Sequence, residues 1–302
     1  MKIPRIPGVN IYDSSQAVDS AKEFIAKRRR GEIRGLKTQW TTLNRAIGGG
    51  WDRATQVIIG AQTSVGKSAF ANIMVQSMLE LNPDPIIVLY FNFEMSCKEQ
   101  IIRNVSSKIG MTVQEIKSTE SYLDDDTYYK ITETADKLKE YNYVFVDTPM
   151  DKDMIEQVIR WYSEQYPACT IINLFDHTRL ILSEKNQREM DMLDGVSGMG
   201  VRLKNELGTI NIFISQLNRE MMDNDRRRLG FEPENTHIFG SSRVAQDANT
   251  IMLLHRPELY NIEVYYKYPT ENKMFIHLTK NRDGPVGMLV FNHNIGINQI
   301  TE

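Results

Sequence analysis

The sequence predicts an α/β fold: a mostly parallel, twisted sheet flanked by helices and followed by an antiparallel β extension. Three observations predict it. Short runs rich in Val, Ile, Leu and Phe alternate with helical patterns, and they lack polar alternation, as strands buried on both faces do. A phosphate-loop pattern joins the first run to the first long helix. Towards the C-terminus, shorter runs with partial alternation flank an Asp-Gly turn, which is typical of a hairpin.

The composition fits one large domain with a small appendage. The chain has 302 residues, of which 41% are hydrophobic and 25% charged, so it can bury a sizeable core. A net charge of −3 excludes a global basic field, so any contact with nucleic acid must be local. Cys97 and Cys169 are too few for a disulfide framework or a zinc site. With no signal-peptide pattern and no apolar run of about 18 residues, we expect a cytoplasmic protein without a membrane partner.

Residues 1–34 are predicted to form an extended arm and a linker helix. Val18, Ala21, Phe24 and Ile25 fall on one helical face, and a run of three arginines ends the helix, where cations are favourable. A short helix cannot bury such a stripe alone. We therefore expect it to lie either on its own domain or on a neighbouring subunit.

From residue 35 onwards the elements alternate. Residues 35–51 read as a loop-rich passage, and apolar runs then predict six strands at 56–60, 86–92, 143–146, 169–175, 209–215 and 250–255. A helix is predicted over residues 68–81, and a capping box of Thr112 and Glu115 opens another. The extension is predicted as β segments at 265–268, 273–279 and 286–292.

The turn after the first strand has the pattern of a phosphate-binding loop. Its usual first glycine is replaced by Ala61, with Gly60 one residue earlier. Backbone N–H groups of such a turn, next to a helix N-terminus, form a concave site for anionic oxygens. Lys67 supplies a charge for the β- and γ-phosphates, and Ser68 a hydroxyl for Mg²⁺, which predicts a nucleotide and Mg²⁺ as ligands. The predicted nucleotide-binding residues are Gly60, Ala61, Gln62, Thr63, Ser64, Val65, Gly66, Lys67, Ser68 and Ala69.

Polar residues at strand ends add the groups that hydrolysis needs. Glu94 follows the second apolar run, and a carboxylate there can deprotonate an attacking water, as in RecA-like ATPases. A second carboxylate must hold the Mg²⁺ water shell; Asp147 and Asp176 both fit, and the pattern does not choose between them. Gln216 ends another buried strand, where its amide can donate to a phosphate oxygen or position a water.

Six motifs extend this pattern over nearly the whole chain. They are G-A-Q-T-S-V-G-K-S, F-N-F-E-M-S, N-L-F-D-H-T-R-L-I, I-S-Q-L-N-R, A-Q-D-A-N-T-I-M-L-L-H-R and K-N-R-D-G-P-V-G. Over about residues 35–290 their order and spacing resemble the C-terminal ATPase domain of DnaB-type replicative DNA helicases. The resemblance implies that the nucleotide is ATP, and it implies a RecA-like P-loop ATPase domain at 35–302 that assembles as a homo-oligomeric ring, expected to be a hexamer.

The resemblance also implies residue roles. Ser68 and Asp176, rather than Asp147, match the Mg²⁺ residues. Lys280 and Arg282 match the pair that enters the ATP site of the next subunit; two residues apart on a strand, they face the same way. An arginine supplied in this way stabilises charge on the transferring phosphoryl group. The implied catalytic residues are Glu94, Asp176, Gln216, Lys280 and Arg282.

DNA contact in this family involves loops that face the central channel of the ring. The matching candidates are Arg226, Arg227, Arg228, Gly240, Ser241, Ser242 and Arg243. Phe239 and Gly240 stand where the family usually has an Arg-Glu pair, so we expect a different grip on the phosphate, with Phe239 either stacked on a base or in the core. His177 and Asn249 replace the usual Tyr and Asp.

The predicted function is that of a ring-forming, ATP-dependent DNA helicase, which translocates on single-stranded DNA and unwinds duplex during replication. Two alternatives remain: a RadA- or KaiC-like ring ATPase or recombinase without unwinding, and a helicase loader or decoy subunit. The family's N-terminal collar, which binds primase, has no counterpart in the roughly 34 residues before the ATPase region. The sequence therefore suggests a compact helicase of a phage or mobile element or a relative with another role, acting in a bacterial cell or infected host, with primase, loader or other replisome proteins as candidate partners.

Overall fold

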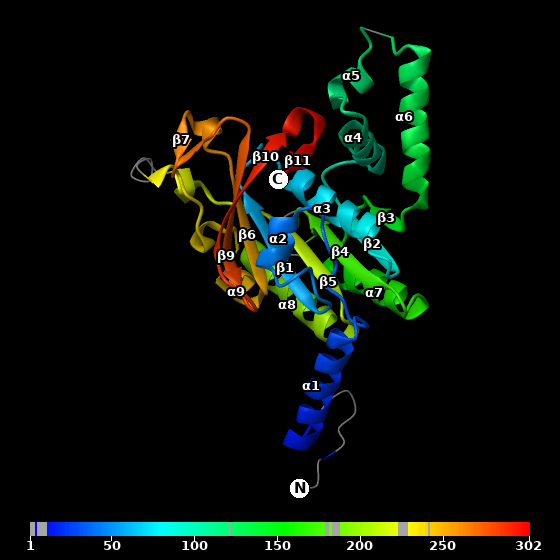
Figure 1. Ribbon diagram of the computed structural model, residues 1–302, viewed down its shortest axis with the longest axis vertical. Helices are drawn as coiled ribbons and strands as arrows, with labels where there is room; N and C mark the ends of the chain where they lie inside the picture. Colours follow the sequence, from blue (N-terminus) through cyan, green and yellow to red (C-terminus); the bar gives the residue numbers. More distant parts are fainter. Residues whose placement is uncertain are drawn as a thin grey trace.

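The protein is built on a nine-stranded sheet whose two faces are both covered (Figure 1). The computed structural model describes Pro4 and residues 11–120, 122–178, 181–182, 188–222, 229–240 and 242–302. Along the sheet the strand order is β11-β10-β9-β6-β1-β5-β4-β2-β3. From β6 to β3 all neighbours pair in parallel, whereas β9, β10 and β11 pair antiparallel. The predicted fold class is therefore confirmed.

The six strands of the parallel part agree with the predicted runs to within one residue at each end. They are β1 (Thr55–Ala61), β2 (Ile86–Asn92), β3 (Tyr143–Val146), β4 (Thr170–Asp176), β5 (Ile210–Gln216) and β6 (Thr250–His255). The extension consists of β9 (Lys273–Asn281), β10 (Gly287–Asn294) and β11 (Gln299–Thr301). The predicted hairpin at Asp283-Gly284 joins β9 to β10, which pair antiparallel.

Helices lie on both faces of the sheet. Within the described residues the α-helices are α1 (Ser14–Arg29), α2 (Thr41–Ala46), α3 (Lys67–Leu81), α4 (Cys97–Ile109), α5 (Val113–Lys117), α6 (Asp125–Lys137), α7 (Lys152–Gln165), α8 (Glu189–Leu207) and α9 (Ser242–Asp247). Short 3₁₀ turns are η1 (Leu138–Glu140), η3 (Arg219–Met222), η5 (Asn235–His237), η6 (Pro257–Tyr260) and η7 (Ile295–Ile297). Among the described residues, none of the helices combines the length and apolar composition needed to cross a bilayer.

The two faces of β1 explain its unbroken apolar run. Val57 and Ile59 belong to the cluster that packs under α3, whereas Ile58 belongs to the cluster under α7 and α8. Each of these residues therefore meets a helical layer, which favours an apolar side chain at every position. On the α3 face, the ring of Trp40 stacks on Phe70 with centroids 4.6 Å apart.

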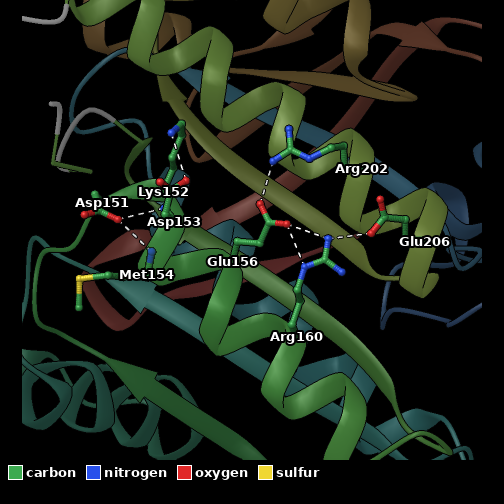
Figure 2. Close-up of polar contacts among 8 residues, drawn as sticks. All are labelled: Asp151, Lys152, Asp153, Met154, Glu156, Arg160, Arg202 and Glu206. Atoms are coloured by element: carbon green, nitrogen blue, oxygen red, sulfur yellow. Dashed lines mark hydrogen bonds and ion pairs between the residues drawn. The ribbon is translucent and has the colours of Figure 1, made fainter. Parts of the chain in front are cut away.

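Glu156 ties α7 to α8 on the other face (Figure 2). Its carboxylate accepts hydrogen bonds from Arg160, one turn along α7, and from Arg202 on α8. The guanidinium of Arg160 also donates a hydrogen bond of 2.7 Å to the carboxylate of Glu206 on α8. This charged cluster sits on the outer side of the two helices, whose apolar sides face the sheet.

Helix α1 extends away from the sheet at the bottom of Figure 1. None of its residues is buried, and its apolar face stays open: Val18 and Phe24 are each 49% exposed and Ile25 63%. Its end contacts the body through an ion pair between Arg28 and Asp52. The first of the two predicted placements of the stripe, on its own domain, is therefore wrong.

Two other predictions differ from the structure. The segment 265–268 does not join the main sheet; a separate two-stranded sheet is formed there by β7 (Val264–Tyr265) and β8 (Tyr268–Pro269). The passage 35–51, expected to be loop-rich, contains α2, whose Leu43 is fully buried. The capping box predicted at Thr112 is confirmed as the start of α5.

Candidate nucleotide-binding site

The turn between β1 and α3 requires glycine at position 66. Gly66 precedes the first residue of α3 with φ +106°, and a Cβ there would lie 2.8 Å from Cδ1 of Ile295. Ser64 is also left-handed, with φ +66°. The chain thus bends sharply into the helix, whose first-turn N–H groups have no partner within the helix and favour anionic oxygens.

A cavity of about 240 Å³ lies over this turn. Nine of its lining residues were predicted from the sequence: Thr63, Ser64, Gly66, Lys67, Ser68, Ala69, Glu94, Asp176 and Gln216. Four others were not: Arg103, His177, Ile295 and Asn298. The remaining residues predicted to bind nucleotide do not line the cavity: Gly60, Ala61, Gln62 and Val65. Ala61 and Val65 instead point into the core, so these residues shape the turn from beneath.

Lys67 folds back over the loop. Its ammonium donates hydrogen bonds of 3.1 Å to the carbonyl oxygens of Ala61 and Gln62. Burial lowers the pKa of Lys67, and the carboxylates of Asp176 and Glu94 act in the opposite direction. The cation therefore belongs to the same electrostatic unit as the two acidic residues.

Asp176 lies at the end of β4 and is only 4% exposed. The hydroxyl of Tyr90 donates to its Oδ2 at 2.8 Å, and Ser68 bonds to the same carboxylate. Burial raises the pKa of Asp176, although these two hydrogen bonds oppose the rise. Asp147, the competing candidate, accepts from the backbone N–H of Cys97 and does not line the cavity. The geometry thus brings Asp176, and not Asp147, to Ser68.

Glu94 follows β2 and lines the cavity. The backbone N–H of Phe93 donates to the carbonyl of Asp176, so the β2–β4 pairing continues up to the residue before Glu94. The side chain of Glu94 is 58% exposed, and its Oε2 lies 3.9 Å from Nε2 of His177. A carboxylate with this access to solvent, next to a phosphate loop, can take a proton from water.

Gln216 touches the phosphate loop directly. Its amide nitrogen donates to the hydroxyl of Thr63 at 2.9 Å. Its backbone carbonyl accepts the N–H of Phe239, and Leu217 donates to the carbonyl of Ala61. A short chain of hydrogen bonds therefore joins the loop to the segment that leads into α9.

Lys280 and Arg282 lie near the start of β6, at the opposite end of the strands from this cavity. Asn281 pairs with Thr250, which is level with Val57 in β1, four residues before the strand ends at Ala61. At about 3.3 Å per residue, that separation is about 13 Å along the strand before the loop begins. The structure therefore does not bring Lys280 and Arg282 to the loop of the same chain.

At that far end, Lys280 donates to the carbonyls of Ala245 and Gln246 at the end of α9. Burial lowers the pKa of Lys280, and the neighbouring guanidinium of Arg282 lowers it further. The backbone N–H of Arg282 donates to the carbonyl of Asn249. Asn249 also accepts from the backbone of Gln56, so a neutral amide in place of the family's usual Asp joins β1 to the start of β6.

The predicted DNA-contacting residues are described only in part. Arg226, Arg227, Arg228 and Ser241 lie outside the described residues. Gly240 has φ +122°, and Ser242 and Arg243 begin α9. Arg243 lies 3.9 Å from Asp247, one turn later. Phe239 packs against the core, which agrees with the second of its two predicted roles.

The chain is similar in sequence to a family of helicase domains and in fold to solved structures. The model of the DnaB-like helicase C-terminal domain matches residues 35–302. The replicative DNA helicases DnaB of Geobacillus stearothermophilus and DnaC of Bacillus subtilis are each 27% identical, over 86% of this chain and 54% of theirs. Among solved structures, one ATPase domain has a TM-score of 0.83 at 23% identity, over 96% of this chain and 99% of that one. A DnaB-like replicative helicase, studied with primase, scores 0.83 over 96% and 68%.

These findings differ in what they establish. The structural matches, at 23% identity, show the fold. The chain spans about half the length of the curated relatives that it matches. The family model covers most of the chain, including every residue of the cavity. The chain therefore belongs to the family of DnaB-like helicase C-terminal domains.

Proposed function

We propose that the protein is a ring-forming, ATP-dependent DNA helicase that translocates on single-stranded DNA and unwinds duplex during replication. One observation carries the proposal: the phosphate loop, Glu94, Asp176 and Gln216, which lie far apart in sequence, line a single cavity. Membership of the family of helicase domains, and relatives named replicative helicases, support it. We assign the activity to the cytoplasm of a bacterial cell or infected host, since the relatives named above are bacterial.

ATP is the proposed substrate. The N–H groups at the start of α3 bind its phosphate oxygens, and Lys67 adds a positive charge there. The bonds from Lys67 to the carbonyls of Ala61 and Gln62 hold this charge at the loop. Glu94 takes the proton from the attacking water, and Gln216, bonded to Thr63, responds to the phosphates.

The residues of the cavity fit Mg²⁺. Asp176 offers a buried carboxylate and Ser68 a hydroxyl, and oxygen ligands of this kind, completed by waters and phosphate oxygens, are those that Mg²⁺ prefers. When bound, Mg²⁺ supplies positive charge that stabilises the phosphate oxygens. The chain's own part is to hold Asp176 and Ser68 against one another.

We propose that Lys280 and Arg282 act on the ATP site of the next subunit. Their position at the opposite end of the sheet supports a contact across an interface, because the same chain cannot make it. Contacts between two different surfaces close into a ring when the rotation permits, and we propose a hexamer. Residues 1–34 are then an arm and linker helix, and residues 35–302 the ATPase domain.

The proposed DNA-binding residues form two groups. They are Arg226, Arg227 and Arg228, and Gly240, Ser241, Ser242 and Arg243 before and at the start of α9. The hydrogen bond between Phe239 and Gln216 supports coupling of this segment to the phosphate loop. Since one similar structure was studied with primase, primase is a candidate partner here, as is a loader.

The test is ATP hydrolysis with and without single-stranded DNA, alongside unwinding of a forked duplex. We expect Glu94→Gln to lower DNA-stimulated turnover by on the order of 100-fold or more, because the water loses its base. Lys67→Ala should abolish it through loss of phosphate binding. Lys139→Ala, which changes an exposed lysine that does not line the cavity, serves as the control and should leave turnover unchanged.

Two further outcomes separate the alternatives. Strand exchange without unwinding indicates a recombinase-like ring ATPase. A protein that remains monomeric with nucleotide and shows no stimulation by DNA contradicts the helicase proposal.

A further inference from the structure

The hydroxyl of Tyr90 sits directly against the carboxylate of Asp176. Tyr90 lies on β2, next to β4, and two residues before Asn92, which pairs with Asp176. Its hydroxyl donates to Oδ2 at 2.8 Å, and both residues are buried, Tyr90 completely. The same sheet face carries Val88 and Leu174, which are apolar, and the buried Asn92, whose Oδ1 accepts from the backbone N–H of Met95; the hydroxyl of Tyr90 is the group of this face that bonds to the carboxylate.

The ring of Tyr90 is fixed from the other side. Tyr143 of β3 packs edge-on against it, with centroids 5.9 Å apart, and Phe145 packs at 6.0 Å. The hydroxyl of Tyr143 donates to Asn72 of α3 at 2.8 Å, and Asn72 bonds in turn to Asn104 of α4. Two residues of β3 therefore confine the ring, and one of them is itself fixed to α3 and, through Asn72, to α4, which leaves the Tyr90 hydroxyl little freedom to leave Asp176.

Asn72 links this network to the phosphate loop. It lies four residues after Ser68 on α3, and residues four apart share a helix face. The network therefore includes the helix that carries Ser68, and Ser68 and Tyr90 are the two hydroxyl residues that lower the pKa of Asp176 by hydrogen bonding.

We propose that Tyr90 is a positioning residue for the metal carboxylate: its hydroxyl occupies Oδ2 of Asp176, so that Oδ1 is presented to the divalent cation that accompanies the nucleotide. The inference rests on the proposed ATP-binding function of the cavity. If Tyr90 only filled space in the core, phenylalanine at this position would serve equally well, because the hydroxyl adds nothing to apolar packing. Outer partners that orient a metal ligand typically change metal affinity by about 10- to 100-fold when they are removed.

The experiment compares Tyr90→Phe with Tyr141→Phe. Both changes remove one phenolic hydroxyl that donates to a carboxylate, but Tyr141 bonds to Glu80, outside the cavity. Equilibrium binding of a fluorescent N-methylanthraniloyl ADP is measured over a Mg²⁺ series and in EDTA. We expect Tyr90→Phe to raise the half-saturating Mg²⁺ concentration by about 10-fold. Its affinity in EDTA should stay within about twofold of the wild type.

Thermal melting of each variant checks that the protein is folded. Phenylalanine keeps the ring of Tyr90, so we expect Tyr90→Phe to remain folded at the temperature of the binding measurement. A second pair of proteins, Asp176→Asn with and without Tyr90→Phe, should show the same Mg²⁺ response, since the carboxylate on which Tyr90 acts is already gone.

Three results overturn the inference alone: Mg²⁺ curves of Tyr90→Phe and wild type that coincide, a shift of equal size in Tyr141→Phe, or an equal loss of affinity in EDTA. A wild-type protein that binds no nucleotide at all overturns the proposed function and this inference with it.

Discussion

His255, the last residue of β6, is a titratable group enclosed in the core next to the backbone of Gly230. It is fully buried, and its Nε2 lies 2.8 Å from the carbonyl oxygen of Gly230, to which it must donate. Burial lowers the pKa of His255 to about 3. The neutral imidazole therefore anchors the chain at Gly230, just after the segment that carries Arg226, Arg227 and Arg228.

This pKa predicts how stability depends on pH. Because the folded pKa lies below the ordinary value of about 6.5, the unfolded chain binds the proton more readily between these two values. The stabilising contribution of His255 is complete above about pH 6.5 and is lost as the pH falls towards 3. At pH 5 the loss amounts to about 2 kcal/mol. His255→Gln keeps a donor for Gly230 but does not titrate.

We therefore expect the loss of unfolding free energy between pH 7.5 and 5.0 to be smaller by about 2 kcal/mol in His255→Gln than in the wild type, as measured by urea denaturation. Burial also lowers the pKa of His277 and His293, so part of the pH dependence remains in the variant. Equal pH dependence of variant and wild type would contradict the prediction.

At the scale of elements, the charged cluster around Glu156 in Figure 2 links two helices, and its contribution to stability can be measured. Glu156 is bonded by two arginines, one on each helix, and only 18% of its side chain is exposed. Burial raises the pKa of Glu156, but the bonds from Arg160 and Arg202 outweigh it and hold the pKa below its usual value. The carboxylate is thus ionised at neutral pH and links α7 to α8.

Glu156→Ala leaves two cations facing each other across the helices. We expect it to lower the free energy of unfolding by about 1 kcal/mol in low salt, with a smaller effect at 1 M NaCl because surface charges are then screened. Glu133→Ala breaks an exposed pair with Lys137 within one helix and should cause no measurable change. A loss that is the same at both salt concentrations would show that Glu156 acts through packing instead of charge.

The elements also show what the sequence can and cannot predict. The parallel strands were predicted to within one residue because five of the six are buried almost throughout, which favours a long apolar run, and the edge strand β3 has apolar side chains that pack against both core clusters. In contrast, α2 was missed because its six residues, between glycines, depend on the packing of Leu43 in the core. The pair β7 and β8 has only two residues per strand, too few for a pattern.

The same distinction holds for the candidate site. The loop residues were identified because a local motif carries them. Arg103 and Ile295 reach the cavity only when α4 and η7 pack beside α3, and nothing in their neighbouring residues indicates this. The apolar pattern alone did not choose between Asp176 and Asp147, and only the family resemblance implied Asp176. Strand order gives the physical reason: β4, which ends at Asp176, is separated from the loop strand β1 by β5 alone, whereas β3, which precedes Asp147, is the edge of the sheet.

At the scale of the whole molecule, the ATP site is proposed to be shared between subunits, and this can be tested by mixing. Arg282→Ala removes the proposed cation supplied to the next subunit, and Lys67→Ala removes phosphate binding in its own. Each variant alone should lose DNA-stimulated hydrolysis, Arg282→Ala by on the order of 1,000-fold, as expected for an arginine finger.

In a ring mixed from both variants, some interfaces pair an intact loop of an Arg282→Ala subunit with the intact Arg282 of a Lys67→Ala subunit. Such interfaces contain a complete site, so mixing should restore measurable hydrolysis, with a maximum near equal amounts of the two proteins. Native mass spectrometry of the mixture verifies that subunits exchange. Exchanged rings that recover no hydrolysis would contradict a shared site. Full activity of Arg282→Ala alone would exclude Arg282 from it, because the reaction would then proceed without this guanidinium.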